Sequence, residues 1–298
     1  MPAWSAKCGL WCCIAFAILL AGPRLVGAQG PSIGPPSPLG SDLASDFKYF
    51  ANNAEADLED VVTSPLHVGD AGELLRSPRF YLVLAGSGAA FGGSFALDQT
   101  VRSHLRGMSS GDANLLEDTS MYTISAASVL LYAYGLYSHD ARAREYMLTA
   151  GESAGLASLV VLAMKAGFGR LRPNQDHHDH DAFFHQGSSF VSGEVTPMFA
   201  LAAGISEYYD NRWYVAAPVY SLALLDGFGR IGHDRHWLSD VIGSALLGVG
   251  TSELLLYLHR YHAEHPWRMR IFPTAPSSST GSRTRLSVPM GATIALDW

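Results

Sequence analysis

Six apolar stretches dominate the chain between residues 79 and 260, and each is longer than an ordinary β-strand. They occupy residues 79–97, 119–137, 145–166, 192–208, 213–227 and 236–260. None of them alternates apolar and polar residues in the manner of a half-buried strand. Glycine, proline and polar runs separate them, as breaks between helices do. The pattern therefore predicts an all-α fold, a helical bundle of about six core helices.

The first 28 residues have the features of a secretory signal peptide. Lys7 supplies a basic start, residues 10–21 are apolar apart from the cysteines, and Val26-Gly27-Ala28 fits a small-residue cleavage site. The chain has three cysteines, and all lie within this segment: Cys8, Cys12 and Cys13. The processed chain would therefore have no disulfide, no thiolate metal site and no cysteine nucleophile.

Charge and length limit the class of protein. The formal net charge is −7, and loss of the signal peptide, which holds Lys7 and Arg24 but no acid, would make it −9. An acidic chain without a basic patch is a poor nucleic-acid binder, so we expect no nucleic-acid partner. The remaining length suits one large domain, and the sequence does not reveal its oligomeric state.

Composition divides the chain into four parts. Residues 29–42 are rich in Pro, Gly and Ser and are predicted to be a flexible leader. Residues 43–265 form the predicted helical domain, and residues 266–298 form a tail. The tail ends with apolar residues at every second position, namely Val288, Met290, Ala292, Ile294, Leu296 and Trp298. Period two is typical of a strand, so we expect a short C-terminal β segment, a hairpin.

Several of the apolar stretches are long enough to span a bilayer, although acidic residues interrupt them. These residues are Glu152, Glu207, Asp226 and Asp240. If residue 29 starts on the outer side of the membrane, a membrane-spanning third helix would place Lys165 on the cytoplasmic side. A phosphate pocket facing the cytoplasm would not fit a chain that is secreted. We therefore expect a secreted, periplasmic bundle that is soluble or associated with the membrane surface. A membrane-embedded form is the alternative.

Three clusters of charged and small residues lie between Lys165 and Asp240. They read Lys165-x6-Arg172-Pro173, then Ser189-Phe190-Val191-Ser192-Gly193-Glu194, then Gly229-Arg230-x5-His236-x3-Asp240. His236 and Asp240 are four residues apart and share one face of a helix. A carboxylate beside an imidazole fixes its tautomer and leaves the other ring nitrogen free to attack. The pair is a candidate nucleophile with its orienting acid.

The other residues of the clusters can hold an anion. Arginine offers a planar fork that fits phosphate oxygens, and lysine adds a point charge. Ser192 and Gly193 precede an apolar helical run, where free N–H groups bind anions. Each fragment alone also has an ordinary structural explanation, such as a surface ion pair, a solvated arginine or a helix N-cap. Their combination points to a phosphate pocket.

In order and spacing, the three clusters closely resemble the signature of the type 2 phosphatidic acid phosphatases (PAP2). That superfamily also includes bacterial acid phosphatases and vanadium haloperoxidases, and its pattern is Lys-x6-Arg-Pro, Pro-Ser-Gly-His and Ser-Arg-x5-His-x3-Asp. The chain matches the pattern at Lys165, Arg172, Pro173, Ser192, Gly193, Arg230, His236 and Asp240. It departs from the pattern at Val191, Glu194 and Gly229, which replace Pro, His and Ser. The resemblance covers about residues 75–260.

The resemblance implies a helical phosphomonoesterase without a metal or other cofactor, acting on a phosphorylated small molecule or lipid. The implied phosphate ligands are Lys165, Arg172, Arg230, Ser192 and Gly193. His236 would form a phosphohistidine intermediate, with Asp240 orienting it. Vanadate would be a cofactor only under a haloperoxidase alternative, which also needs the missing histidine.

Glu194 stands where the family carries the histidine that protonates the leaving group and activates water. A protonated Glu194 could take this role and give an acidic optimum. Another acid could replace it, either His233 or one of the loop histidines His177, His178, His180 and His185. As a third possibility, Glu194 pairs with Arg172 or Arg230 and blocks the site. The chain would then be a catalytically impaired phosphate-binding relative.

Three further features lie near the clusters. Residues 176–181 mix His and Asp, and we expect a solvated lid there rather than a metal site. Phe183, Phe184 and Phe190 are candidates for apolar contact with the organic part of the ester, or they pack the loop. The sequence Gly-Phe-Gly-Arg occurs at 167–170 and at 227–230. We expect this repeat to be coincidental, and the alternative is that Arg170 and Arg230 line one pocket mouth.

Overall fold

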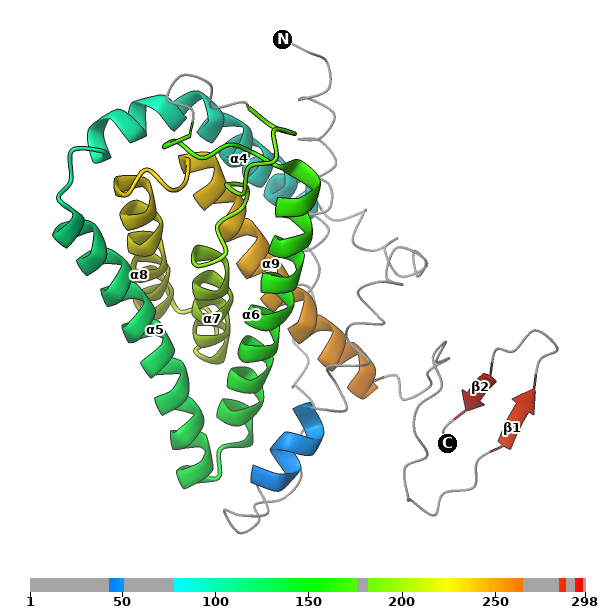
Figure 1. The fold of residues 1–298 in the computed structure, drawn as a ribbon. Coiled ribbons are helices and arrows are strands. Elements are labelled where there is room, and N and C mark those ends of the chain that lie inside the picture. The colour runs from blue at the N-terminus through cyan, green and yellow to red at the C-terminus, as the bar shows by residue number, and fades with distance from the viewer. Residues whose placement is uncertain (1–42, 51–77, 176–181, 265–283, 288–292, 297–298) are drawn as a thin grey trace.

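The computed structural model describes residues 43–50, 78–175, 182–264, 284–287 and 293–296. Within these residues, six long helices form the body of the protein (Figure 1). They are α4 (Pro78–Leu105), α5 (Ser110–Ser138), α6 (Ala141–Phe168), α7 (Val195–Tyr208), α8 (Trp213–Gly232) and α9 (Leu238–Glu264). The predicted all-α bundle of six core helices is confirmed. The predicted signal peptide and leader, and residues 176–181, lie outside the described residues.

The ends of the helices follow from local chemistry. The Ser109 side chain accepts a hydrogen bond from the Asp112 backbone N–H at the start of α5, and Asp140 caps α6 in the same way through Ala143. Gly169 ends α6 with a φ of 50° and donates its N–H to the Lys165 carbonyl. These caps fix where the chain leaves each helix.

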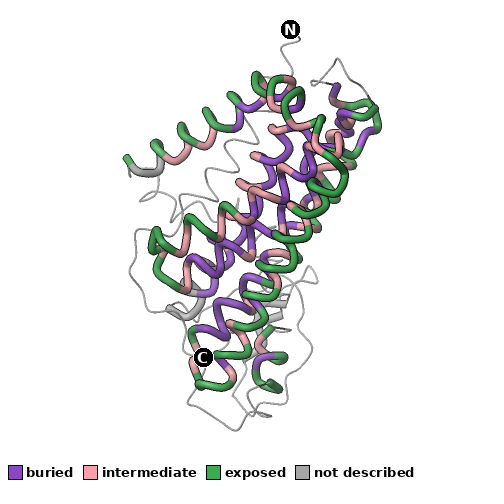
Figure 2. The backbone as a smooth tube through the Cα atoms, turned by 90° about the vertical axis from the view of Figure 1, so that its left-hand side faces the viewer, coloured by how far each residue is buried: buried purple, intermediate pink, exposed green. Residues whose placement is uncertain are grey.

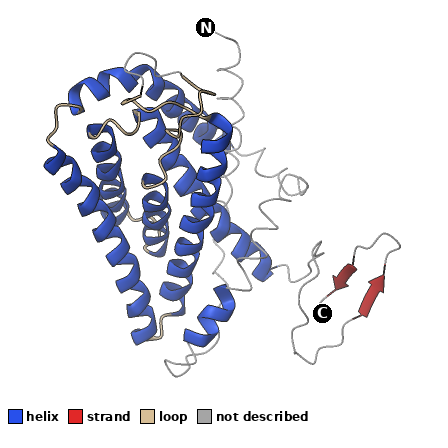
Figure 3. Ribbon diagram, in the orientation of Figure 1, coloured by secondary structure: helices blue, strands red, loops and turns tan. Residues whose placement is uncertain are grey.

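Two helices begin later than the apolar stretches that predict them. Helix α7 starts at Val195 rather than at residue 192, and α9 starts at Leu238 rather than at residue 236. Ser192 to Glu194 and His236 therefore lie in the connections before these helices. These connections, together with residues 169–175, cluster at one end of the bundle (Figures 1 and 3).

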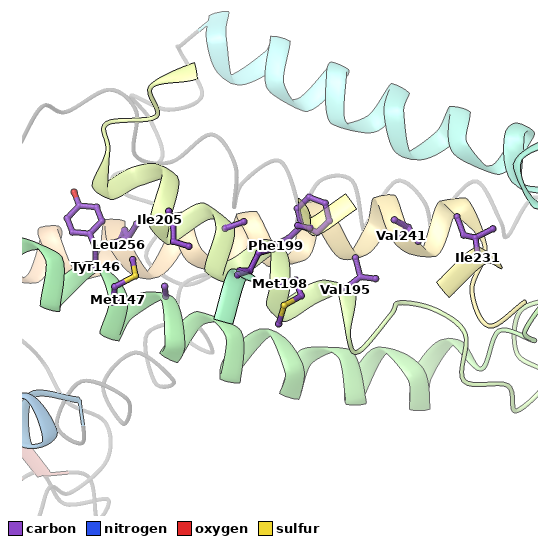
Figure 4. Packing of buried hydrophobic residues seen from close by; sticks show 13 residues of the cluster. Tyr146, Met147, Val195, Met198, Phe199, Ile205, Ile231, Val241 and Leu256 are labelled. Carbon is purple, nitrogen blue, oxygen red and sulfur yellow. The ribbon is translucent and has the colours of Figure 1, made fainter. Parts of the chain in front are cut away.

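The hydrophobic core surrounds α7, which packs against α5, α6, α8 and α9. Side chains from α6, α7, α8 and α9 meet in this core, among them Tyr146, Met198, Phe199, Ile231 and Val241 (Figure 4). The packing is close at Gly204, where an added Cβ would lie 2.4 Å from the Cβ of Ala150. Glycine at this position lets α7 approach the backbone of α6.

Several large apolar side chains are exposed on the helices, while some polar and charged side chains are buried. Figure 2 shows where the buried and exposed residues lie along each helix. On α5 the exposed side chains include Met121, Tyr122, Val129 and Leu130, whereas the buried residues are Ala113, Ser120, Ile124, Ser128 and Gly135. Helix α6 exposes Leu159 and Leu162 but buries Glu152. Exposed apolar residues together with buried polar ones are unusual for an amphipathic helix in water.

Two of the described helices are long and apolar enough to cross a membrane, namely Ala141–Phe168 and Leu238–His259. Only 39% of the most apolar window of α6 is buried inside the protein, compared with 61% for α9. Much of the apolar surface of α6 therefore has no protein cover within the described residues.

Two smaller elements complete the description. Residues 43–50 are helical, and Asp46 joins this helix to the bundle through Arg144, at 2.5 and 2.9 Å, and through the Tyr132 hydroxyl, at 2.8 Å. In the tail, β1 (Thr284–Ser287) and β2 (Thr293–Leu296) pair antiparallel. The predicted alternating segment overlaps β2, and residues 288–292 and 297–298 lie outside the described residues.

The close contact between α6 and α7 predicts that Gly204→Ala lowers stability. The added methyl would overlap Ala150, and overpacking of this kind costs about 1–3 kcal/mol. Gly151→Ala is the matched control, because an added Cβ there meets nothing within 4 Å and alanine favours helix by about 1 kcal/mol. Thermal unfolding should show a lower Tm for Gly204→Ala and an equal or higher Tm for Gly151→Ala. Equal Tm values for the two variants would contradict the packing.

Candidate active site

His236 is buried in the turn between α8 and α9. Its Nδ1 atom lies 3.5 Å from Asp240 Oδ2, in the first turn of α9. His236 therefore faces Asp240 as predicted, but it lies in the turn before α9 rather than on the same helix. The Nε2 atom is on the far side of the ring from the carboxylate. Burial lowers the pKa of His236, and the contact with Asp240 opposes this effect only in part. The imidazole is thus held in the neutral form that a nucleophile requires.

Three hydrogen-bond donors hold the carboxylate of Asp240, whereas His236 Nδ1 lies 3.5 Å from it and has no hydrogen-bond partner among the described residues. Arg170 Nη1 lies 2.5 Å from Oδ1, the Ser189 hydroxyl donates to Oδ2 at 2.5 Å, and the Trp237 backbone N–H donates to the same oxygen at 2.9 Å. Both Arg170 and Asp240 are fully buried. Charge-assisted hydrogen bonds in a buried setting are among the strongest in proteins, so Asp240 has a fixed orientation.

Arg170 does not line a pocket mouth with Arg230, so the alternative in which the two Gly-Phe-Gly-Arg copies share one pocket is wrong. Its guanidinium lies inside the bundle, where Nη2 contacts Asp98 on α4 at 2.8 Å and Nη1 also donates to the Ser239 hydroxyl at 2.7 Å. The rings of Phe95 and Phe183 each lie 5.0 Å from its central carbon. The apolar helix before Arg170 is the signal that favours this burial, although the repeated motif suggested symmetry.

The three predicted phosphate-binding cations lie near one another and close to His236. Lys165, in the last turn of α6, has charge interactions with Arg172 and Arg230, and Lys165 and Arg230 both interact with His236. The Nε atoms of Arg172 and Arg230 are buried and have no hydrogen-bond partner among the described residues. Buried donors of this kind are ordinarily satisfied, so an anion that binds here would meet unpaired N–H groups.

Ser192 and Gly193 lie close to these cations. A Cβ added to Gly193 would be 3.5 Å from Lys165 Nζ, so the glycine backbone borders the lysine head group. Ser192 is fully buried, and its hydroxyl accepts a weak hydrogen bond from the Val195 N–H at 3.4 Å. The structure therefore brings all the sequence-predicted phosphate ligands to one end of the bundle.

Glu194 forms an ion pair with Arg230. The same Nη1 atom of Arg230 also bonds Glu117 on α5, at 3.0 Å. Two carboxylates are therefore bound to the guanidinium of Arg230, which is predicted to hold phosphate. The Glu194 side chain is 57% exposed, whereas that of Glu117 is 16% exposed, so Glu194 is the partner with room to move away.

Glu117 was not singled out by the sequence. The signal that could have found it is Gly229, which replaces the family's serine. A Cβ at residue 229 would lie 2.6 Å from Glu117 Cγ and 2.8 Å from the Ala113 carbonyl oxygen. The glycine therefore leaves space for α5 and for the Glu117 side chain beside Arg230.

Two of the alternative acids lie within the described residues. His233 Nε2 contacts Asn114 on α5 at 2.9 Å and lies 3.7 Å from Glu117, and His185 is exposed. The histidines at 177, 178 and 180 lie outside the described residues. No group of three or more potential metal ligands occurs among the residues that the structure describes. Of the loop aromatics, Phe190 is buried, Phe183 packs beside Arg170, and Phe184 is 58% exposed.

Comparison with known families agrees with this arrangement. The family model of the PAP2 superfamily matches residues 146–264, which include Lys165, Arg172, Glu194, His236 and Asp240. Residues 146–264 belong to the PAP2 superfamily. The family match begins within α6 and runs to the end of α9, so it covers every connection that carries the candidate site.

Two curated relatives are similar to this chain over part of its length. Lipid A 1-phosphatase from Porphyromonas gingivalis is 30% identical over 54% of the chain and 34% of the relative. Undecaprenyl-diphosphatase BcrC from Bacillus subtilis is 32% identical over 43% of the chain and 65% of the relative. The alignments thus span about a third and somewhat under two thirds of these relatives. A crystal structure of a transmembrane PAP2-type phosphatidylglycerolphosphate phosphatase from Bacillus subtilis aligns over 76% of the chain and 98% of its own, with 22% identity and a TM-score of 0.31.

The Glu194–Arg230 contact predicts that Glu194→Gln tightens phosphate binding. Removing the charge leaves Arg230 with Glu117 as its remaining carboxylate partner in that contact, and the gain should be roughly 3-fold to 10-fold, equivalent to about 1 kcal/mol. Asp210→Asn is the matched control, because Asp210 is also an exposed carboxylate paired with an arginine, Arg142, but lies in the turn between α7 and α8. Calorimetric titration with inorganic phosphate measures the change. Equal affinities for Glu194→Gln and the unmodified protein would contradict the competition.

Proposed function

We propose that the protein is a phosphomonoesterase that acts on lipid phosphates through a phosphohistidine on His236. The observation that carries the proposal is the grouping of a buried His236 with Asp240, at 3.5 Å, and with the Lys165, Arg172 and Arg230 cations. Phosphoryl transfer needs little from a protein beyond positioning and charge stabilisation, and these residues offer both.

In the first step, the Nε2 lone pair of His236 attacks phosphorus and the P–O bond to the leaving group breaks. Lys165, Arg172 and Arg230 stabilise the charge on the three equatorial oxygens, with help from the Ser192 hydroxyl and the Gly193 N–H. Asp240 stabilises the positive charge that develops on the imidazole. The leaving alkoxide takes its proton from the carboxyl group of Glu194.

In the second step, Glu194 is ionised and accepts a proton from water. The water oxygen attacks phosphorus, the P–N bond breaks, and its electron pair returns to Nε2 of His236. Inorganic phosphate leaves and the enzyme is restored. Because Glu194 is more than half exposed, it has access to water and can exchange its contact with Arg230 for one with the substrate. Glu194 is therefore the acid and base of the proposal.

Two observations support a lipid substrate. Both curated relatives are named for phosphorylated lipids, lipid A and undecaprenyl diphosphate. The outward apolar faces of α5 and α6 would contact lipid tails, while Glu152 and the other inward charges would stay within the bundle. We accordingly propose that the bundle is embedded in the membrane, in place of the soluble form expected from the sequence. The secreted, periplasmic location remains a prediction from the signal peptide.

Exposed aromatic side chains at the end of the bundle away from His236 support the embedding. Tyr137, in the last turn of α5, is 87% exposed, and Trp213, in the first turn of α8, is 79% exposed. Trp and Tyr concentrate at membrane–water interfaces. One interface is then at this aromatic end, and the catalytic end is at the other.

The mechanism predicts activity with an acidic optimum. Glu194 must be protonated to release the leaving group, so the rate should fall as the pH rises. The lowered pKa of His236 keeps its nucleophilic neutral form present to a more acidic pH than an ordinary histidine allows. Rates with an aryl phosphate and with a lipid phosphate in detergent, from pH 4 to pH 8, measure the profile.

Three substitutions test the roles of the two residues. His236→Ala should abolish turnover, Glu194→Gln should lower the rate about 100-fold or more, and Glu194→His should move the pH optimum upward. Normal hydrolysis by His236→Ala would overturn the mechanism.

Membrane embedding predicts that cysteines on the apolar faces are shielded. In a chain whose three native cysteines are replaced by serine, Leu130→Cys and Leu162→Cys should react slowly with a water-soluble maleimide in intact vesicles, because thiolate forms poorly in lipid. Ser103→Cys, exposed near the catalytic end of α4, is the control and should react quickly. All three should react after denaturation. Equal rates in intact vesicles would contradict embedding.

A second candidate function is phosphate or phospholipid binding without turnover. The observation that favours it is the double carboxylate contact on Arg230 by Glu117 and Glu194. Absence of turnover at every pH, with phosphate still bound, would establish this function instead of the first.

A further inference from the structure

Arg170 connects three parts of the chain that are distant in sequence. It extends from the loop after α6 to Asp98 on α4 and to Asp240 on α9, with N–O distances of 2.8 and 2.5 Å. All three side chains have no exposed surface. Ser239 completes the group, because its hydroxyl contacts both Arg170, at 2.7 Å, and Asp98, at 2.6 Å.

This group satisfies Asp98 as well as Asp240. Asp98 Oδ1 accepts the Ser239 backbone N–H at 2.7 Å, so α4 holds the first turn of α9 directly. Arg170 then fixes Asp240 from the side opposite to His236. The aromatic rings of Phe95, Phe183 and Trp237 enclose the guanidinium at 5.0 to 5.6 Å and exclude water from it.

We propose that Arg170, anchored by Asp98, is a positioning residue that sets the orientation of Asp240 and through it the tautomer of His236. Arg170 is fully buried, and its contacts described above are with Asp98, Ser239 and Asp240. It acts on the reaction only through the carboxylate. The inference rests on the proposed function for its effect on rate, but its effect on the imidazole is independent of turnover.

The chain offers a matched control in Arg102. This arginine is also buried, also pairs with an aspartate at 2.7 Å, and lies 5.5 Å from the same Trp237 ring. Its partner is Asp234, in the α8–α9 turn, rather than Asp240. If a substitution acts only by loosening the packing around Trp237, the Arg102 and Arg170 variants should therefore show the same effect on the His236 tautomer.

The experiment compares Arg170→Lys with Arg102→Lys in protein labelled with ¹⁵N-histidine. His236→Asn assigns the His236 signals, and the ring nitrogen shifts report the tautomer. Lysine keeps the charge but cannot contact Asp98 and Asp240 as a planar fork does. We expect a proton on Nδ1 in the unmodified protein, a mixture of tautomers in Arg170→Lys and no change in Arg102→Lys. Asp98→Asn should give the same change to a smaller extent, and it replaces Arg170→Lys if that variant does not fold.

Kinetics on the same proteins separate this inference from the proposed function. Arg170→Lys should lower kcat about 10-fold to 100-fold, the range for partners that orient a functional histidine, with inhibition by inorganic phosphate unchanged. A tautomer change in a chain without turnover would uphold the inference and reject the phosphatase. An unchanged tautomer in Arg170→Lys and Asp98→Asn, or an equal change in Arg102→Lys, would overturn the inference.

Discussion

The buried ion pair between Arg170 and Asp240 is the contact on which the candidate site depends. It joins the loop after α6 to the first turn of α9, and Asp98 extends it to α4. Loss of the carboxylate partners of a buried arginine lowers the stability of a protein by about 3–5 kcal/mol. We therefore expect α4, the loop after α6 and the first turn of α9 to adopt this arrangement together. The orientation of His236 is a consequence of this constraint, because Asp240 has donors on every side.

The pocket itself presents a competition between carboxylates and phosphate. Arg230 is paired with Glu117 and Glu194 before any substrate arrives, and a phosphate must share or replace these partners. The exposed position of Glu194 makes the exchange possible, whereas Glu117 is held between α5 and α8 by the close approach at Gly229. The departures from the family pattern at residues 194 and 229 therefore act at the same arginine.

The sequence predicted much of this arrangement, and the reasons are physical. Long apolar stretches without alternation indicated the six helices. The spacing of His236 and Asp240 brought the two residues together, although His236 lies before α9 and not on it. The Glu194–Arg230 pair was among the possibilities that the sequence offered. The contacts of Arg170 with Asp98 and of Arg230 with Glu117 could not be predicted, because these acids reach the site from α4 and α5, far away in the sequence. The boundary at Val195 was also missed, since hydropathy does not distinguish the buried connection at Val191 and Ser192 from the first turn of a helix.

The central claim is that His236 carries the phosphoryl group, and trapping the intermediate tests it most directly. A brief reaction with ³²P-labelled lipid phosphate, stopped in alkali, should leave label on the protein that is lost in acid, as expected for phosphohistidine. His236→Asn should carry no label. Turnover without any labelled protein, or equal labelling of His236→Asn, would contradict the account.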